Sequence, residues 1–189
     1  FFYRDAVANE ACSAHTEILH GKEMSYNNYV DGDGALEAVK EFAGRPAAAI
    51  IKHTNPCGCA TGATLAEALE AAWAGDPVSS FGSVIAVTMP VDLATAEVLK
   101  GRFVEALIAP DFTPEALDFL KSKSKDIRLL RLQRPMTQAF EGKALRQVGG
   151  GMLIQDRDVG EEERWMIPTE HPFPDEKRLL AEFGIKVCK

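Results

Sequence analysis

Short apolar segments alternate with longer amphipathic segments through the middle of this 189-residue sequence. The apolar segments are bounded by turn residues, as buried strands are, and the segments between them are about as long as a ten-residue helix. The predicted strands are 46–53, 83–89, 105–110 and 127–132. Because strands joined by helices of this length pair mainly in parallel and need helical cover, the sequence predicts an α/β fold with a mostly parallel sheet and helices on both faces.

Capping residues predict where two of the helices begin. Thr64 and Glu67 have the spacing of a capping box, and Thr113 with Pro114 supplies an N-cap followed by a proline in the first turn. Further helices are predicted at about 93–100 and, after an acidic and proline-punctuated surface connection that follows residue 158, at 175–189.

Glycine, proline and asparagine predict the turns. Asn55, Pro56 and Gly58 have the positions of a type I turn after the first strand. A loop that enters a helix is predicted near Asp31, and the folded unit is expected to begin there. Three consecutive glycines at 149–151 indicate a hairpin, a bulge or a close approach of the backbone to another group.

Composition excludes several classes of function. A net charge of −7 and a pI near 5.2 argue against a general binder of nucleic acid or of anionic membranes, because phosphate groups are usually met by a basic surface. No apolar run approaches the roughly 18 to 20 residues that cross a membrane and no secretory leader is evident, so a cytoplasmic location is expected. The four cysteines are too few and too unevenly spread for a disulfide framework, and they are expected to be reduced.

Two short motifs together point to a metal site. His-Thr-Glu at 15–17 and Pro-Cys-Gly-Cys at 56–59 resemble the H-x-E and P-C-x-x-C signature of zinc nucleoside deaminases. That signature needs two residues between its cysteines, whereas only Gly58 separates Cys57 from Cys59. We therefore predict no metal and keep a zinc-dependent nucleoside or base deaminase as an alternative function.

A nucleophilic cysteine is a second hypothesis for the same segment. Cys57 precedes a predicted helix and lies near a lysine, and both features lower the pKa of a thiol. The sequence does not place any particular histidine beside this thiol as a base. The candidates are His15, His20, His53 and His171. A buried turn cysteine explains the same pattern without chemistry.

Lys52 and His53 form the third candidate site, at the end of the first predicted strand. An ammonium group beside an imidazole disfavours the charged imidazolium form, which leaves a neutral base, and the ammonium can stabilise negative charge that develops on a ligand. Consecutive residues of a regular strand face opposite sides. Both side chains can reach one ligand only if the strand ends or bends here, and a pair of exposed polar residues is the alternative interpretation.

Two further segments offer ligand contacts. Asn27 and Asn28 belong to an amide-rich segment that is expected to form a turn, and adjacent amides can recognise a ligand amide through paired donors and acceptors. Gly82 precedes a predicted strand at a point where the backbone could approach a ligand closely. Neither segment identifies a ligand by itself.

Taken in order, five segments resemble the transformylase domain of the bifunctional purine enzymes that join AICAR transformylase to IMP cyclohydrolase. AICAR is the aminoimidazole carboxamide ribonucleotide of purine synthesis. The segments are LHGKEMSYNN, IIKHTNPCGCA, SSFGSVIAV, EALIAP and VGGGMLIQDRD, and the resemblance runs over about residues 15–158 and more weakly to the end. It implies formyl transfer from 10-formyltetrahydrofolate to the exocyclic amine of AICAR, and a fold like that of cytidine deaminases without the zinc.

The resemblance assigns roles to particular residues. His53 is implied to be the proton acceptor, and Lys52 is implied to stabilise the transition state. Asn27, Gly82 and Glu105, together with His53, fall where similar proteins contact AICAR. The two cysteines of the PCGC segment match no catalytic residue of the family.

The resemblance also implies that this chain is a part of a longer enzyme. Residues 1–189 are expected to be a partial transformylase domain, with a first deaminase-like subdomain at about 31–158 and a connection to the next segment at 159–189. A catalytic asparagine, most folate contacts and the cyclohydrolase domain are expected elsewhere in the protein, which is expected to form a homodimer. A non-catalytic nucleotide-binding remnant is the remaining alternative.

Overall fold

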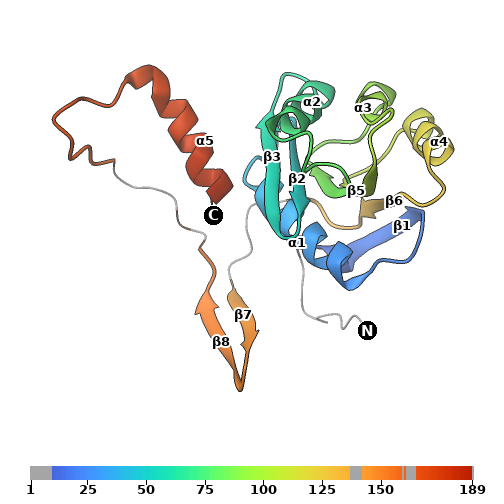
Figure 1. Cartoon of the computed structure of the whole chain (residues 1–189), viewed down its shortest axis with the longest axis horizontal. Coiled ribbons are helices and arrows are strands. Elements are labelled where there is room, and N and C mark those ends of the chain that lie inside the picture. The colour runs from blue at the N-terminus through green and yellow to red at the C-terminus, as the bar shows by residue number, and fades with distance from the viewer. Residues whose placement is uncertain (1–9, 137–141, 159, 161–164, 189) are drawn as a thin grey trace. The chain divides into compact units, whose positions relative to one another are not determined.

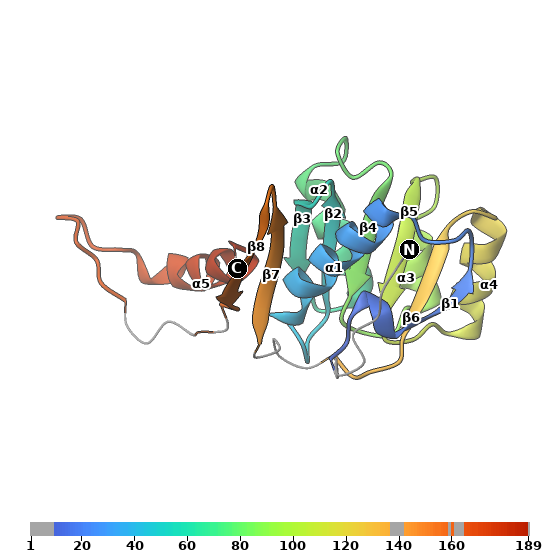
Figure 2. The same ribbon diagram turned by 90° about the horizontal axis from the view of Figure 1, so that it is seen from below.

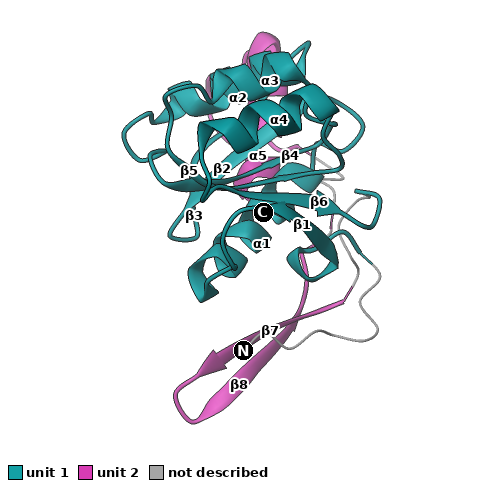
Figure 3. Ribbon diagram, turned by 90° about the vertical axis from the view of Figure 1, so that its right-hand side faces the viewer, with its two compact units in different colours: residues 1–138 teal, residues 139–189 magenta. Residues whose placement is uncertain are grey.

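The computed structural model describes residues 10–136, 142–158, 160 and 165–188. The chain divides into two compact units, 1–138 and 139–189, which we describe separately (Figure 3). The strands of unit 1 are β1 (Thr16–His20), β2 (Ala47–Lys52), β3 (Asn55–Thr61), β4 (Ser83–Val87), β5 (Val104–Ala109) and β6 (Arg128–Leu132). Its helices are α1 (Tyr26–Lys40), α2 (Leu65–Gly75), α3 (Leu93–Val98) and α4 (Pro114–Lys123), and a 3-10 turn, η1 (Ser13–His15), precedes β1.

The six strands of unit 1 form one sheet in the order β1-β6-β5-β4-β2-β3. β4, β5 and β6 are parallel neighbours, whereas β1 pairs antiparallel with β6, and β2 pairs antiparallel with both β4 and β3. Four of the six strands, β3 to β6, therefore share one direction. Helices α2, α3 and α4 cover one face and α1 covers the other (Figures 1 and 3). The predicted α/β fold is confirmed, while its likeness to cytidine deaminases stays a prediction.

Alternate residues of the central strands pack on opposite faces of the sheet, as the two-residue period of a strand requires. Ile85 of β4 and Leu107 of β5 belong to the hydrophobic core that includes residues of α2, α3 and α4. Ala86 and Ile108, one position along each strand, are fully buried on the other face, beneath α1. Burial on both faces explains why these strands are continuous apolar runs in the sequence.

Helix α1 lies across β2 and β4 (Figure 2), and glycines bring it close to the sheet. A Cβ atom added to Gly32 would lie 3.1 Å from Cδ1 of Ile108, which is tighter than an ordinary contact. Gly34 has more room, with 3.7 Å between an added Cβ and Cγ2 of Ile51. The small residue at position 32 therefore sets the distance between this helix and the sheet.

The predicted helix starts at Thr64 and Thr113 are confirmed. The Thr64 hydroxyl accepts a hydrogen bond from the N–H of Glu67 at 3.2 Å, and the Thr113 hydroxyl accepts one from the N–H of Ala116 at 3.3 Å. The Glu67 carboxylate in turn accepts from the Thr64 N–H, which completes the capping box. The four predicted strands agree with β2, β4, β5 and β6 to within two residues at either end.

The predicted type I turn at residues 55–58 is wrong. β2 and β3 form a hairpin, and the chain reverses at His53 and Thr54, so residues 55–58 begin a strand. Pro56 is tolerated in β3 because this strand lies at the edge of the sheet. The reversal lies three residues earlier than turn propensities indicate, and Asp31 of α1 accepts hydrogen bonds from the backbone of the observed turn.

Helix α1 begins earlier than the sequence predicted. The Ser25 hydroxyl accepts a hydrogen bond from the Asn28 N–H at 3.2 Å, while the Asn28 side-chain oxygen accepts from the Ser25 N–H at 3.0 Å. An asparagine thus takes the place of the usual Glu or Gln in a capping box. The amide-rich segment predicted to be a turn is largely helical, and both this helix start and β1 precede the expected beginning of the folded unit at Asp31.

Unit 2 contains a hairpin and a helix. β7 (Lys143–Val148) and β8 (Gly151–Asp156) pair antiparallel around a turn in which Gly150 has a φ of +79°, so a hairpin is present among the three possibilities that the glycines indicated. A 3-10 turn, η2 (Asp175–Lys177), leads into α5 (Arg178–Cys188), which confirms the final helix. Part of the predicted connection, at 159 and 161–164, lies outside the described residues. The subdomain boundaries at 31–158 and 159–189 stay a prediction.

Across the described parts of both units, no helix is long and apolar enough to cross a membrane.

Candidate functional site

Predicted site residues from distant parts of the sequence lie at one end of the unit 1 sheet. β4, β5 and β6 begin at this end, and β2 finishes there, because the last residues of β2 pair with the first residues of β4. We call this end the amino-end rim and define it by Lys52, Gly82, Glu105 and Arg128. The fold therefore gathers three of the predicted residues and adds one that was not predicted.

Lys52 links the end of β2 to the segment before β4. Its Nζ donates a hydrogen bond to the Phe81 carbonyl at 2.6 Å. The next residue, Gly82, has a φ of +76° and donates its N–H to the Phe103 carbonyl at 2.9 Å. An ammonium group has three N–H donors, so one bond to a carbonyl leaves Lys52 able to present positive charge and a donor to a ligand at the rim.

His53 is the first residue of the turn that follows Lys52, and its side chain is exposed. Its φ is +54° and that of Thr54 is +62°, so both residues have left-handed backbone conformations. The change of conformation at His53 ends the strand alternation that would send consecutive side chains to opposite sides. The strand therefore ends at this pair, which is what Lys52 and His53 need in order to reach one ligand. Their chemical roles stay predictions.

The turn is held from outside the hairpin by Asp31 of α1. Its Oδ1 accepts a hydrogen bond from the Thr54 N–H at 2.8 Å, and its Oδ2 accepts one from the His53 N–H at 3.3 Å. Asp31 is buried, at 9% exposure. One carboxylate from the helix thus serves two consecutive backbone donors next to the candidate base.

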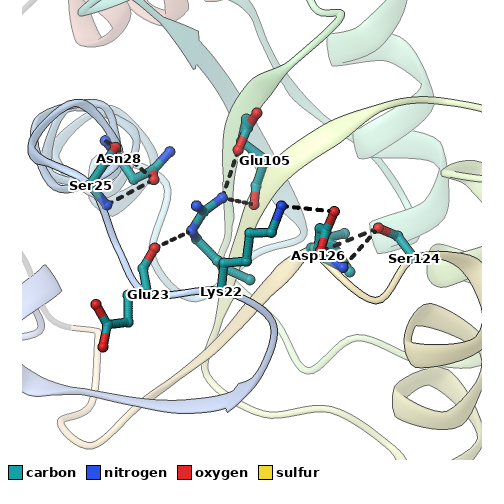
Figure 4. Close-up of polar contacts among 9 residues, drawn as sticks. Lys22, Glu23, Ser25, Asn28, Glu105, Ser124 and Asp126 are labelled. Carbon is teal, nitrogen blue, oxygen red and sulfur yellow. Dashed lines mark hydrogen bonds and ion pairs between the residues drawn. The ribbon is translucent and has the colours of Figure 1, made fainter.

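Glu105, which lies at the start of β5 and is labelled in Figure 4, is paired with Arg128. Nη1 of Arg128 donates to Oε2 of Glu105 at 2.6 Å, and Nε donates to the Glu23 carbonyl at 2.9 Å. The arginine is buried whereas the side chain of Glu105 is 36% exposed. A buried guanidinium therefore orients a partly exposed carboxylate, which retains lone pairs for the N–H or O–H donors of a ligand.

The two adjacent asparagines of the predicted amide pair have different environments. Asn28 is buried, and its side-chain oxygen is used by the N-cap of α1, as Figure 4 shows. Asn27 lies in the first turn of the same helix and is exposed. Asn27 alone is therefore presented to solvent, and paired recognition of a ligand amide by both residues is not supported.

Burial raises the pKa of both thiols in the PCGC segment. The pKa of Cys59 rises to about 11. Burial is also the largest cause of the raised pKa of Cys57, followed by the negative charge of Asp76, while Lys52 acts in the opposite direction. The predicted lowering of the Cys57 pKa is wrong, because this residue lies in a strand packed against α2 rather than at a helix start. Protonated thiols are poor nucleophiles.

The two halves of the zinc-deaminase signature lie at opposite edges of the sheet. His15 ends η1 and Glu17 lies in β1, whereas Cys57 and Cys59 belong to β3, and strands β6, β5, β4 and β2 lie between β1 and β3. Among the described residues, no three His, Cys, Asp or Glu side chains are grouped so that they could hold a metal ion. The alternative of a zinc-dependent deaminase is therefore not favoured.

Comparison with known proteins agrees with the resemblance that the five sequence segments carry. The family described as the AICARFT/IMPCHase bienzyme matches the chain over residues 1–189. The chain belongs to this family.

Several relatives in the AICARFT/IMPCHase bienzyme family carry the name bifunctional purine biosynthesis protein PurH. The chain is 47% identical to the protein from Halalkalibacterium halodurans and 46% identical to that from Bacillus subtilis, in each case over 100% of this chain. It is 49% identical to the Lysinibacillus sphaericus protein over 83% of this chain. The chain spans 37%, 36% and 30% of the lengths of these three relatives.

Sequence reasoning missed two residues that organise the rim of this AICARFT/IMPCHase family member. Arg128 carried a usable signal, because a buried charge in the apolar strand IRLLRL needs a partner. Asp31 carried no such signal, since His53 and Thr54, the residues that it contacts, lie 22 and 23 positions further along the chain. Only the packing of α1 on the sheet brings them together.

Proposed function

We propose that this chain carries the amine-activating residues of an AICAR transformylase, which transfers the formyl group of 10-formyltetrahydrofolate to the exocyclic amine of AICAR. Membership of the AICARFT/IMPCHase bienzyme family and the purine biosynthesis named for its relatives support this class of reaction. The observation that carries the proposal is the position of Lys52 and His53, a cation and a potential base, where β2 ends in a left-handed turn.

The chemistry explains why a base and a cation are needed together. The exocyclic amine of AICAR is a weak nucleophile because its lone pair is delocalised toward the carboxamide. In the proposed step the amine nitrogen forms a bond to the formyl carbon while His53 accepts a proton from that nitrogen. The bond from the formyl carbon to N10 of the folate then breaks, and N10 takes up a proton to give tetrahydrofolate. Lys52 stabilises the negative charge on the formyl oxygen in the transition state.

Three further residues are proposed to bind AICAR. Asn27 offers an exposed amide at the start of α1, and Glu105 offers a carboxylate oriented by Arg128. Gly82, with left-handed backbone at the rim, is proposed to contact the ligand through its main chain, since the ring of Phe103 occupies the place of a side chain, 3.3 Å from an added Cβ atom. These groups supply the donors and acceptors that fix the orientation of a polar ligand, and His53 contacts the same ligand as its base.

We also propose that the full-length protein binds the folate co-substrate and forms a homodimer. The family resemblance alone supports these two proposals. In the full-length protein, formyl-AICAR is proposed to be closed to IMP by the cyclohydrolase part. A cytoplasmic location is also proposed, supported by four cysteines that are all unpaired. The described site is therefore one part of the proposed active centre.

Substitution of His53 in the full-length protein tests the proposal. His53→Ala should lower kcat for formyl transfer at least about a hundredfold, as expected when a general base is lost. Lys52→Met should also lower kcat, because it removes the charge that stabilises the transition state. His171→Ala is a matched control, since it removes the same type of side chain from an exposed position of unit 2, and it should leave kcat within about twofold of wild type.

Two results would overturn the proposal. Near-normal turnover in His53→Ala would remove this residue from the mechanism. A wild-type dimer that binds AICAR, as measured by calorimetry, but transfers no formyl group would instead favour a non-catalytic nucleotide-binding protein.

A further inference from the structure

The turn after β2 has an unfavourable backbone conformation. His53 and Thr54 are the only residues other than glycine with positive φ in the described part of the chain. Left-handed backbone is uncommon for such residues, and for a β-branched residue like Thr54 it is a genuine outlier. Strained backbone of this kind persists only where surrounding contacts determine it, and it concentrates at functional sites.

Hydrogen bonds from within the hairpin and from α1 stabilise this turn. Within the hairpin, the Thr54 hydroxyl and the Asn55 side-chain amide donate to the His53 carbonyl at 2.7 and 2.8 Å. From outside, the Asp31 carboxylate accepts from the N–H groups of Thr54 and His53. Hydrogen bonds to a carboxylate are about twice as strong as bonds between neutral groups, so Asp31 forms a strong polar link between the turn and α1.

The position of Asp31 on α1 adds a second connection. Asn27 lies four residues before Asp31, and residues at this spacing occupy the same face of a helix. The same stretch of α1 therefore presents a proposed AICAR contact and holds the turn that carries the proposed base. A shift of this stretch relative to β2 would move the base relative to the bound ligand.

We propose that Asp31 is a positioning residue, whose carboxylate holds the His53–Thr54 turn in its left-handed conformation and thereby fixes the imidazole of His53 beside the ligand. The catalytic consequence rests on the proposed function, whereas the holding of the turn does not. Asp31 acts through the backbone of residues 53 and 54 and is not proposed to contact substrate.

Two variants of Asp31 distinguish its two acceptor oxygens. Asp31→Ala removes both acceptors. Asp31→Asn keeps one carbonyl oxygen and places an NH₂ group toward the second backbone donor, so one hydrogen bond is retained. In the full-length protein, kcat for formyl transfer should fall about tenfold to a hundredfold in Asp31→Ala and by less in Asp31→Asn, while the KM for AICAR changes less than about threefold. Asp33→Ala, at an exposed position of the same helix, is the control for helix and charge effects.

A second substitution tests the role of the turn directly. Glycine adopts positive φ without a steric penalty and is favoured in two-residue hairpin turns. Thr54→Gly in the Asp31→Ala protein should therefore recover kcat severalfold. Failure of the double variant to recover any activity would contradict positioning through the turn, because a substrate contact or a general structural role of Asp31 would not be repaired at residue 54.

Hydrogen–deuterium exchange provides a readout that does not depend on activity. In the full-length protein, exchange at the amides of residues 53 and 54, followed by mass spectrometry, should accelerate at least about tenfold in Asp31→Ala and remain unchanged in Asp33→Ala. Unchanged exchange in Asp31→Ala would overturn the proposal. If wild-type protein transfers no formyl group, the proposed function fails, and the exchange measurement still decides whether Asp31 holds the turn.

Discussion

Replacement of Gly58 by alanine tests whether the PCGC segment is a packing element rather than a chemical site. Gly58 lies in β3 opposite Ile50, where the strand passes against α2. A Cβ atom added to Gly58 would lie 1.9 Å from the carbonyl oxygen of Ala72 and 2.9 Å from its carbonyl carbon. The clash is with helix backbone, which cannot rotate away as a flexible side chain can, so α2 or β3 must move.

The expected loss of stability follows from two opposing terms. Overpacking of a well-packed site costs about 1–3 kcal/mol, and sometimes more, and a contact of 1.9 Å with backbone belongs at the upper end of that range. Replacing glycine by alanine also lowers the entropy of the unfolded chain, which stabilises the protein by about 0.4–1 kcal/mol. We therefore expect Gly58→Ala to lower the free energy of unfolding by about 2–3 kcal/mol.

Equilibrium denaturation in urea measures this change. Trp73 is buried in α2, next to Ala72, so its fluorescence in a Trp165→Phe background reports the packing of α2 on the sheet. With a slope of about 2 kcal/mol per molar urea, the midpoint should fall by about 1 M.

Gly34→Ala is the matched control for Gly58→Ala. An added Cβ would meet Cγ2 of Ile51 at 3.7 Å, an ordinary contact, and alanine is favoured over glycine inside a helix by about 0.5–1 kcal/mol. Gly34→Ala should therefore stabilise the protein. A midpoint for Gly58→Ala equal to or above that of wild type would refute the packing argument.

Three further predictions concern Cys59, Cys57 and Lys40. At a pKa of about 11, roughly one Cys59 thiol in ten thousand is ionised at pH 7. Alkylation of Cys59 by iodoacetamide should therefore be slow at pH 7, and its rate should rise about tenfold per pH unit up to about pH 11. The Cys57→Ser variant should keep the rate of formyl transfer within about threefold of wild type. A catalytic Cys57 would abolish transfer in that variant. Burial lowers the pKa of Lys40, but hydrogen bonds and charge interactions with Glu37 and Glu10 outweigh it and leave the pKa raised above 10.5. The stabilisation that charged Lys40 gives the folded state is therefore complete below pH 10.5 and is lost as pH rises through the folded-state pKa. In Lys40→Met, the thermal unfolding temperature should fall less steeply at alkaline pH than in wild type. An equally steep fall in both proteins would contradict this prediction.

The elements that the sequence predicted well are those whose signals are local. Thr64 and Thr113 cap helices with donors three residues ahead, so their effect is contained in one turn of chain. The central strands were predicted because burial on both faces makes them continuously apolar. Arrangements of neighbouring residues determine these features, and the rest of the fold does not override them.

The elements that the sequence predicted wrongly depend on distant contacts. Turn propensity placed a reversal at Asn55 to Gly58, but the chain reverses at His53 and Thr54, where the Asp31 carboxylate accepts hydrogen bonds from the backbone. Cys57 was expected to have a lowered pKa from its local neighbours, yet packing of β3 against α2 buries it and has the opposite effect. In both cases the packing of a helix against the β2–β3 hairpin is involved, and this packing cannot be read from the local sequence.

The sequence by itself determined the family of this protein, its α/β class and the presence of a lysine and a histidine at the end of one strand. It did so because motif order and hydrophobic periodicity are properties of the chain. Only the tertiary structure decided that Lys52, Gly82 and Glu105 share one rim, that Arg128 orients Glu105, and that Asp31 holds the turn of His53. These relations depend on which strands become neighbours and on how closely α1 packs against them, and such distances exist only in the folded molecule.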